Sequence, residues 1–140
     1  MSDWQEQRRE AAGELAAAAA RRKAAESERA SSLLAEFARA ARERGLRDTE
    51  LLARGLDGRG SYRTGVRGWY LRRNKTLGVG LGGEFYVLSV PGGLRARLRG
   101  VTLRPSDPPL VIGAGGRDGE SIPLPDLLAL RLQSGDDWPS

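Results

Sequence analysis

The segment 69–90 constrains the fold more than any other part of the chain. Its sequence, WYLRRNKTLGVGLGGEFYVLSV, contains three short runs of β-branched and aromatic residues, separated by Asn74-Lys75 and Gly82-Gly83. Both pairs suit two-residue hairpin turns, and Gly-Gly is the stronger signal. The segment therefore predicts a three-stranded antiparallel meander.

Two-residue turns at these places would also fix the strand register. The first turn would pair Trp69 with Gly80, and the second would pair Gly80 with Phe85. Because side chains alternate along a strand, one face would then carry Trp69, Leu71, Phe85 and Val87 around Gly78 and Gly80. The opposite face would carry Tyr70, Leu77, Val79, Leu81, Tyr86 and Leu88. Both faces are apolar and need cover from other segments, and a one-residue slip in the first turn would exchange the faces of the first strand.

Residues 3–44 predict one long helix, because alanine dominates and Gly13 is the only helix breaker. Its second half carries an apolar stripe that includes Leu33, Leu34, Phe37 and Ala41. Two alternatives follow for these four residues. They can cover one face of the meander as part of the core, or they can form a docking face for a partner helix.

The first half of this helix lacks a convincing coiled-coil pattern. A heptad through Trp4, Ala11, Ala18 and Ala25 would place Arg8, Leu15, Arg22 and Arg29 at the other seam position. We therefore expect this half to be solvated or frayed. A partner-free helix of about 40 residues is nevertheless unusual in a domain this small, so an oligomerisation or docking arm stays open, and parallel self-association would account for its length.

Residues 45–57 predict the end of the helical region. Gly45 followed by Leu46 is typical of a helix stop, and Asp48 or Thr49 could start a short helix over 50–54 that ends at Gly55. Residues 57–60 form a turn or linker. We expect two parts, a helical region over 1–57 and a small β domain over 58–140.

The remaining pattern predicts further short elements. An edge strand is expected at 61–64, an alternating strand at 94–104 and a short buried strand at 110–112. Pro125 suits the first turn of a last helix that buries Leu127, Leu128 and Leu132, ends at Gly135 and could cover the second face of the meander. The predicted class is α+β: a long N-terminal helix, a small antiparallel sheet and a short C-terminal helix.

Positive charge is concentrated in the middle of the chain. Residues 58–105 contain nine arginines and Lys75 against the single acid Glu84, a net charge of +9. Aromatic residues lie among these cations, so a sheet face that carries both could bind nucleic acid with low sequence specificity. The alternatives are a solvated face or a surface for an acidic protein. The candidate basic face consists of Arg67, Arg72, Arg73, Lys75, Arg95, Arg97, Arg99 and Arg104.

Composition argues against most catalytic chemistry. The chain has no cysteine and no histidine, which excludes disulfides, thiolate or imidazole metal sites and nucleophiles activated by histidine. The glycine-rich segment 113–121 misses the spacing of phosphate-binding loops. An enzyme would need a carboxylate site built from Glu84, Asp118 or Glu120, and we expect no cofactor and no metal.

The function expected from sequence is a non-catalytic protein interaction or assembly module that uses the N-terminal helix and the basic sheet face. Nucleic-acid binding is the alternative, and an enzyme is the third. No apolar run approaches the length of a membrane span, and nothing resembles a signal peptide. We therefore expect a cytoplasmic protein without membrane contact.

Overall fold

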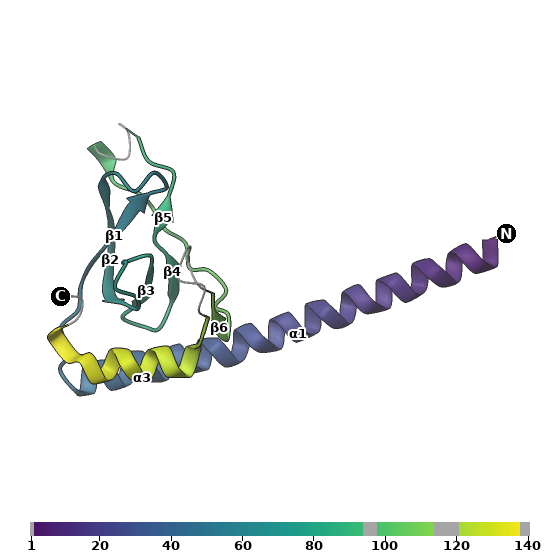
Figure 1. The fold of residues 1–140 in the computed structure, drawn as a ribbon, viewed down its shortest axis with the longest axis horizontal. Helices are drawn as coiled ribbons and strands as arrows, with labels where there is room; N and C mark the ends of the chain where they lie inside the picture. The colour runs from purple at the N-terminus through teal and green to yellow at the C-terminus, as the bar shows by residue number, and fades with distance from the viewer. Residues whose placement is uncertain (1, 94–97, 114–120, 138–140) are drawn as a thin grey trace.

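A computed structural model describes residues 2–93, 98–113 and 121–137. A 42-residue helix, α1 (Ser2–Glu43), is followed by β1 (Thr49–Gly55), β2 (Ser61–Tyr70), β3 (Leu77–Gly80), β4 (Phe85–Val87) and β5 (Ser89–Val90). A two-stranded sheet of β6 (Val111–Ile112) and β7 (Ile122–Pro123) leads into α3 (Leu124–Ser134) and a short 3-10 helix, η1 (Gly135–Asp137). The predicted α+β class is confirmed (Figure 1).

The five-stranded sheet has the order β4-β3-β2-β1-β5. Only β1 and β5 are parallel. Since Leu88 alone separates β4 from β5, this segment pairs first with β3 and then with β1. Leu88 marks the change of partner, because its N–H donates to the Thr76 carbonyl at 2.8 Å and its carbonyl accepts the Arg54 N–H at 2.7 Å. The sheet therefore closes on itself.

The meander exists, but both of its predicted registers are wrong by one residue. Trp69 pairs with Val79, and Val79 pairs with Phe85. The reason is loop length. Leu71 donates to the Leu77 carbonyl and Gly80 to the Glu84 carbonyl, so the loops contain residues 72–76 and 81–83. Loops with an odd number of residues shift the pairing relative to two-residue turns.

Each of the two pairings is shifted by one residue, and the two shifts compensate between β2 and β4. Only β3 therefore has its two faces exchanged relative to the prediction. Trp69, Leu71 and Phe85 share a face, as expected, but Val79 joins them in the core cluster and Gly78 turns to the other side. That other side is the interior of the closed sheet, where Leu51, Tyr70, Tyr86 and Leu88 pack together. Gly78 is needed there because a Cβ would meet the Leu51 and Leu88 side chains at 2.8 and 3.2 Å.

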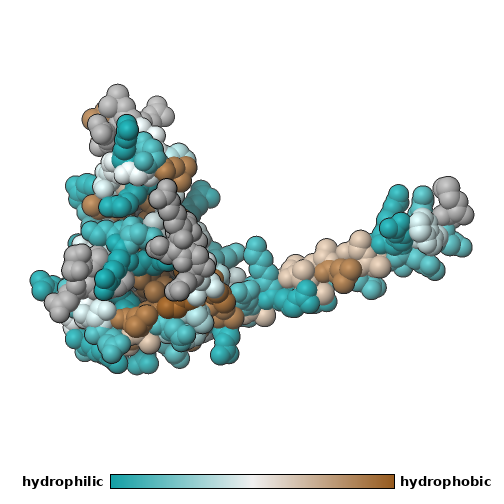
Figure 2. Space-filling model, in the orientation of Figure 1, coloured by the Kyte–Doolittle hydropathy of each residue, from teal (hydrophilic) through white to brown (hydrophobic). Residues whose placement is uncertain are grey.

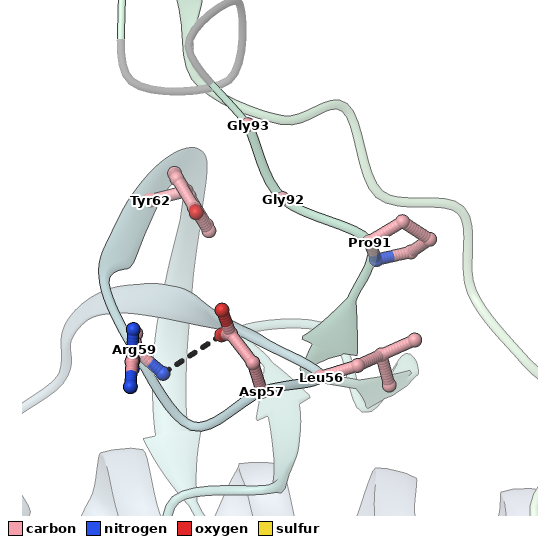
Figure 3. A pocket seen from close by; sticks show the side chains of 7 residues that line it. All are labelled: Leu56, Asp57, Arg59, Tyr62, Pro91, Gly92 and Gly93. Carbon is pink, nitrogen blue, oxygen red and sulfur yellow. Dashed lines mark hydrogen bonds between the residues drawn. The ribbon is translucent and has the colours of Figure 1, made fainter.

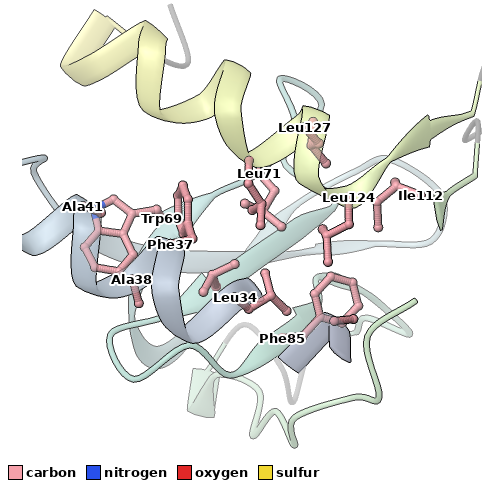
Figure 4. Packing of buried hydrophobic residues seen from close by; sticks show 13 residues of the cluster. Leu34, Phe37, Ala38, Ala41, Trp69, Leu71, Phe85, Ile112, Leu124 and Leu127 are labelled. Carbon is pink, nitrogen blue, oxygen red and sulfur yellow. The ribbon is translucent and has the colours of Figure 1, made fainter. Parts of the chain in front are cut away.

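The helices α1 and α3 cover the same outer face of the sheet (Figure 4). From α1, Leu34 and Phe37 pack against Trp69, which confirms that the apolar stripe of the helix covers one face of the meander. From α3, Leu124 and Leu127 enter the same cluster. The expectation that the last helix covers the second face is wrong, because β1 and β5 close the sheet over that face instead.

Several local predictions can be compared directly with the structure. Gly45 has φ 71° and donates to the Arg42 carbonyl, while Leu46 donates to the Ala41 carbonyl, so the predicted helix stop is confirmed. The last helix carries Pro125 in its first turn and ends at Gly135, also as predicted.

Three other predictions are wrong. The short helix over 50–54 is strand β1, whose residues alternate toward the interior of the sheet. Residues 61–64 are not an edge strand, since β2 lies between β1 and β3. Of the strand expected at 94–104, residues 98–104 contain no strand, and Leu98 is 79% exposed.

Candidate interaction surfaces

The docking face predicted on the helix lies mainly inside the protein. Leu34, Phe37 and Ala41 are buried, and Leu33 is half-buried against the core. The rings of Phe37 and Trp69 meet edge to face, with centroids 6.0 Å apart. Of the two alternatives for these four residues, the structure shows the core helix, so a partner cannot use them without unfolding the domain.

The exposed part of α1 lies at its other end. The helix extends well beyond the rest of the protein (Figure 1), and residues 3–25, here called the arm, are exposed except for the half-buried Ala18. Two large apolar side chains are among them, with Trp4 63% and Leu15 72% exposed. Figure 2 shows an apolar band midway along the arm, with polar residues on both sides.

The arm ends where α1 meets the loop that precedes β6. The Leu110 N–H donates to the Glu26 carboxylate at 3.1 Å, and Ser27 is half-buried. Ala30 is the first fully buried residue of the helix. The boundary between the arm and the packed half of α1 therefore lies at residues 26–30.

Two arginines of the basic segment are paired with acids of β1 and of the connection before it. The Arg67 Nε donates to the Asp48 carboxylate at 2.8 Å, and the Arg63 Nη2 donates to the Glu50 carboxylate at 3.1 Å. These hydrogen bonds hold the pKa of Asp48 and that of Glu50 below their ordinary values. In the folded chain these two ion pairs therefore neutralise part of the positive charge of residues 58–105.

The other described cations of the candidate basic face lie around different hollows. Arg72 donates to the Gly113 carbonyl at 2.8 Å beside Phe85 and Ile112. Lys75 lies over the Tyr70 ring at 5.4 Å, in a hollow shared with Arg47 and Arg131. Arg99 lines a third hollow with Glu50 and Arg63. Arg73 and Arg104 are exposed, while Arg95 and Arg97 lie outside the described residues.

A buried arginine that sequence reasoning missed lies under the second of these hollows. Arg131 is 3% exposed, and it donates through Nε to the Tyr70 carbonyl at 2.8 Å and through Nη1 to the Gly135 carbonyl at 2.9 Å. Burial lowers the pKa of the Arg131 guanidinium to about 10, while the negative charge of Asp136 acts in the opposite direction and raises it. The sequence contained a signal for this burial. Positions 124, 127, 128 and 131 have the spacing of one helix face, so residue 131 is expected on the same buried face as the three leucines.

A hollow of about 500 Å³ lies beside the turn between β1 and β2 (Figure 3). It is lined by Leu56, Asp57, Arg59 and Tyr62 and by residues 91–93. The Asp57 carboxylate accepts the Arg59 backbone N–H at 2.9 Å, which is the usual role of aspartate in a tight turn. This contact assigns Asp57 to the turn.

The acids considered for catalysis give no assembled site. Glu84 is exposed, and its carboxylate accepts the Gly82 N–H at 3.2 Å within the loop before β4. Asp118 and Glu120 lie outside the described residues. The enzyme alternative therefore gains no support from the geometry around Glu84.

Comparison with family models, curated proteins and solved structures finds no match to this chain. No helix within the described ranges combines the length and apolar character that crossing a bilayer requires. The arm and the charged hollows are the features from which a function can be argued.

Proposed function

We propose that this chain is a non-catalytic protein interaction or assembly module and that the arm of α1 is its docking element. One observation carries the proposal: α1 is continuous, yet residues 30–41 complete the core while residues 3–25 stand exposed. The proposed interaction surface is therefore the arm, and not the apolar stripe of the same helix that the sequence predicted as a docking face. The absence of cysteine fits a cytoplasmic location.

The energetics of an isolated helix support this proposal. Helices shorter than about 12–15 residues are marginal in water, and longer ones gain most of their stability from packing an apolar face. The arm has strong helix formers, but among the described residues only Ala18 of the arm is even half-buried, and Trp4 and Leu15 expose apolar surface to water. A partner that covers these side chains would stabilise the helix and remove that exposure.

The basic residues of the sheet support a secondary contact at most. Arg63 and Arg67 are paired with acids, and the other described cations are distributed around separate hollows. An acidic surface could engage Arg104, which is exposed. Low-specificity nucleic-acid binding is the weaker proposal, because it needs a continuous track of cations along the phosphate backbone.

Photo-crosslinking inside cells of the source organism tests the docking role. A photoreactive amino acid is placed at Leu15 on the arm and, as a matched control, at Leu130, which is 52% exposed on α3. We expect a discrete crosslinked protein band from position 15 and none from position 130. The band can contain either a second copy of the chain or another protein.

The opposite results are equally clear. If position 15 gives no crosslinked protein while the variant is folded and expressed at the normal level, the arm is not a docking element. Equal crosslinking from positions 15 and 130 would mean contact without a preferred surface, and that result also overturns the proposal.

A further inference from the structure

We infer that the partner of the arm is a second copy of this chain, paired with it in antiparallel orientation. This inference rests on the proposed docking role of the arm and specifies its partner. It starts from the arrangement of charge, which is uneven along the exposed part of the helix. Residues 3–14 contain four acids and two arginines, a net charge of −2, and residues 21–29 contain four cations and two acids, a net charge of +2.

Orientation decides whether these charges attract or repel. In a parallel pair, each segment would face its own copy, so that net −2 meets −2 and +2 meets +2. In an antiparallel pair, the acidic segment of each copy faces the basic segment of the other. Opposite charges across a helix pair favour one orientation over another, and like charges act against the alternative.

The apolar residues fit the same arrangement. Residues 11–20 overlap the acidic segment at their first four positions and lead up to the basic segment, and alanine and Leu15 occupy all positions except Gly13 and Glu14. Side chains this small allow two helix axes to approach closely. If two arms pair about the middle of this stretch, between residues 15 and 16, each acidic end meets a basic end without a change of register.

The length of the arm fits as well. In this arrangement Trp4 of one copy lies beside residue 27 of the other, next to Glu26, which is hydrogen-bonded to Leu110. The overlap therefore covers the exposed arm and stops where the folded body of the other copy begins. Two bodies that each extend to one side of α1 would lie at opposite ends of the pair (Figure 1).

One pair of positions in this register joins opposite charges directly, because Arg21 of one copy lies opposite Glu10 of the other, whereas a parallel pair would place Arg21 opposite Arg21. Arg22 lies opposite Arg9, so the attraction comes from the net charges of the two segments. The exposed Trp4 already carries Arg8 over its ring, with the guanidinium carbon 4.7 Å from the ring centroid. A second helix could cover the ring further.

A charge-swap series in the full-length chain tests the orientation. The first variant carries Glu6→Arg and Glu10→Arg, so its acidic segment becomes +2, and the second carries Arg21→Glu and Arg22→Glu, so its basic segment becomes −2. The third variant combines all four substitutions. All four positions are exposed, and glutamate and arginine are both strong helix formers, so the fold is preserved.

Sedimentation equilibrium over a wide concentration range measures the dimer dissociation constant of each variant. An antiparallel pair predicts that each double variant dimerises at least about tenfold more weakly than the natural chain and that the fourfold variant recovers. Glu36→Arg, an exposed position on the packed half of α1, serves as the control and should leave the dissociation constant unchanged.

Each other outcome overturns the inference in a distinct way. If the double variants dimerise as well as the natural chain, the pair is not antiparallel. If the fourfold variant fails to recover, charge does not set the orientation. A natural chain that stays monomeric at all concentrations excludes the second copy as partner, while a crosslink from Leu15 to another protein would still support the docking role.

Discussion

The ring of Phe37 on α1 meets the indole of Trp69 on β2 edge to face, with centroids 6.0 Å apart and ring planes at 89°. The indole N–H also donates to the Leu46 carbonyl at 3.2 Å, just beyond the end of α1. This contact joins the helix to the sheet. It explains why the second half of α1 belongs to the core and leaves only the first half for a partner.

Phe37→Ala should therefore unfold the domain more readily instead of weakening association alone. Removing a buried phenylalanine costs about 3–5 kcal/mol, because transfer free energy is lost and a cavity remains. The neighbouring exposed Glu36→Ala should change stability by less than about 0.5 kcal/mol. Urea unfolding followed by tryptophan fluorescence measures both. Equal effects of the two substitutions would contradict the packing described for α1.

The sequence indicated the components of this core but not how they close. Local patterns were sufficient to predict three of these components. Residues 33–46 contain the whole pattern for the apolar stripe of α1 and for the helix stop at Gly45, and residues 69–90 contain the pattern for the three meander strands. Strand β1 could not be recognised in the same way, because Thr49-Glu50-Leu51-Leu52-Ala53 has helix formers at its centre. Pairing with β2 on one side and β5 on the other overrides that local preference.

The register errors have a comparable origin. Asn74 accepts hydrogen bonds from the Thr76 N–H and hydroxyl, and Lys75 adopts φ 59°, so the first loop is longer than its two central residues suggest. In the second loop, Gly83 has φ 96° and lies against Ala35 of α1. Contact with a helix distant in sequence thus fixes the loop conformation, which no local pattern reports. The first half of α1 was expected to be solvated or frayed, and in the structure it is a continuous helix whose residues are exposed except for the half-buried Ala18.

Two glycines should respond oppositely to alanine. At Gly68 a Cβ would collide with the Val79 carbonyl oxygen across the sheet, so Gly68→Ala should destabilise the domain by at least about 2 kcal/mol. At Gly13 on the arm a Cβ would meet nothing within 4 Å. Gly13→Ala should stabilise the arm locally by about 1 kcal/mol, which corresponds to roughly fivefold slower amide exchange.

Urea unfolding measures the first substitution and hydrogen exchange the second. Neutral behaviour of Gly68→Ala would contradict the pairing of β2 with β3. Unchanged or faster exchange in Gly13→Ala would contradict the continuous helix through residue 13.

Acid should remove the stabilisation that Asp48 and Glu50 provide. Hydrogen bonds from Arg67 and Arg63 lower the pKa of each carboxyl from ordinary values of 3.8 and 4.5. A carboxyl with a lowered pKa in the folded state stabilises the fold above its unfolded pKa and loses that effect as pH falls through the folded value. Stability should therefore decline below about pH 4.5 partly because of these two groups.

The double variant Asp48→Asn, Glu50→Gln isolates this contribution. Its urea midpoint should be lower than that of the natural chain at pH 7 and should approach it at pH 3. Glu36→Gln, at an exposed position of α1, is the control and should give equal differences at both pH values. A pH-independent difference for the double variant would show that the two ion pairs do not contribute through their charge.

The buried Arg131 should resist conservative replacement. Its Nε and Nη1 donate to carbonyls 61 and 4 residues away, those of Tyr70 and Gly135. Arg131→Met would leave both carbonyls without this donor and should cost about 2–4 kcal/mol. Arg131→Lys should rescue little, because one ammonium cannot reproduce two donors in a fixed planar arrangement. Thermal unfolding measures the stability of the two variants. If Arg131→Lys were as stable as the natural chain, the two hydrogen bonds of the guanidinium would not be needed, which would contradict this account.

The orientation of two arms can be measured most directly with a single spin label. The chain has no cysteine, so Gln5→Cys accepts one label on the exposed arm. An antiparallel pair centred between residues 15 and 16 places the two labels 21 residues apart along the helix axis, which is about 30 Å by pulsed electron spin resonance. A parallel pair would bring them within about 20 Å, since packed helix axes lie roughly 10 Å apart. A distance near 30 Å is the predicted result, and either the short distance or the absence of dipolar coupling at high concentration would contradict antiparallel self-association.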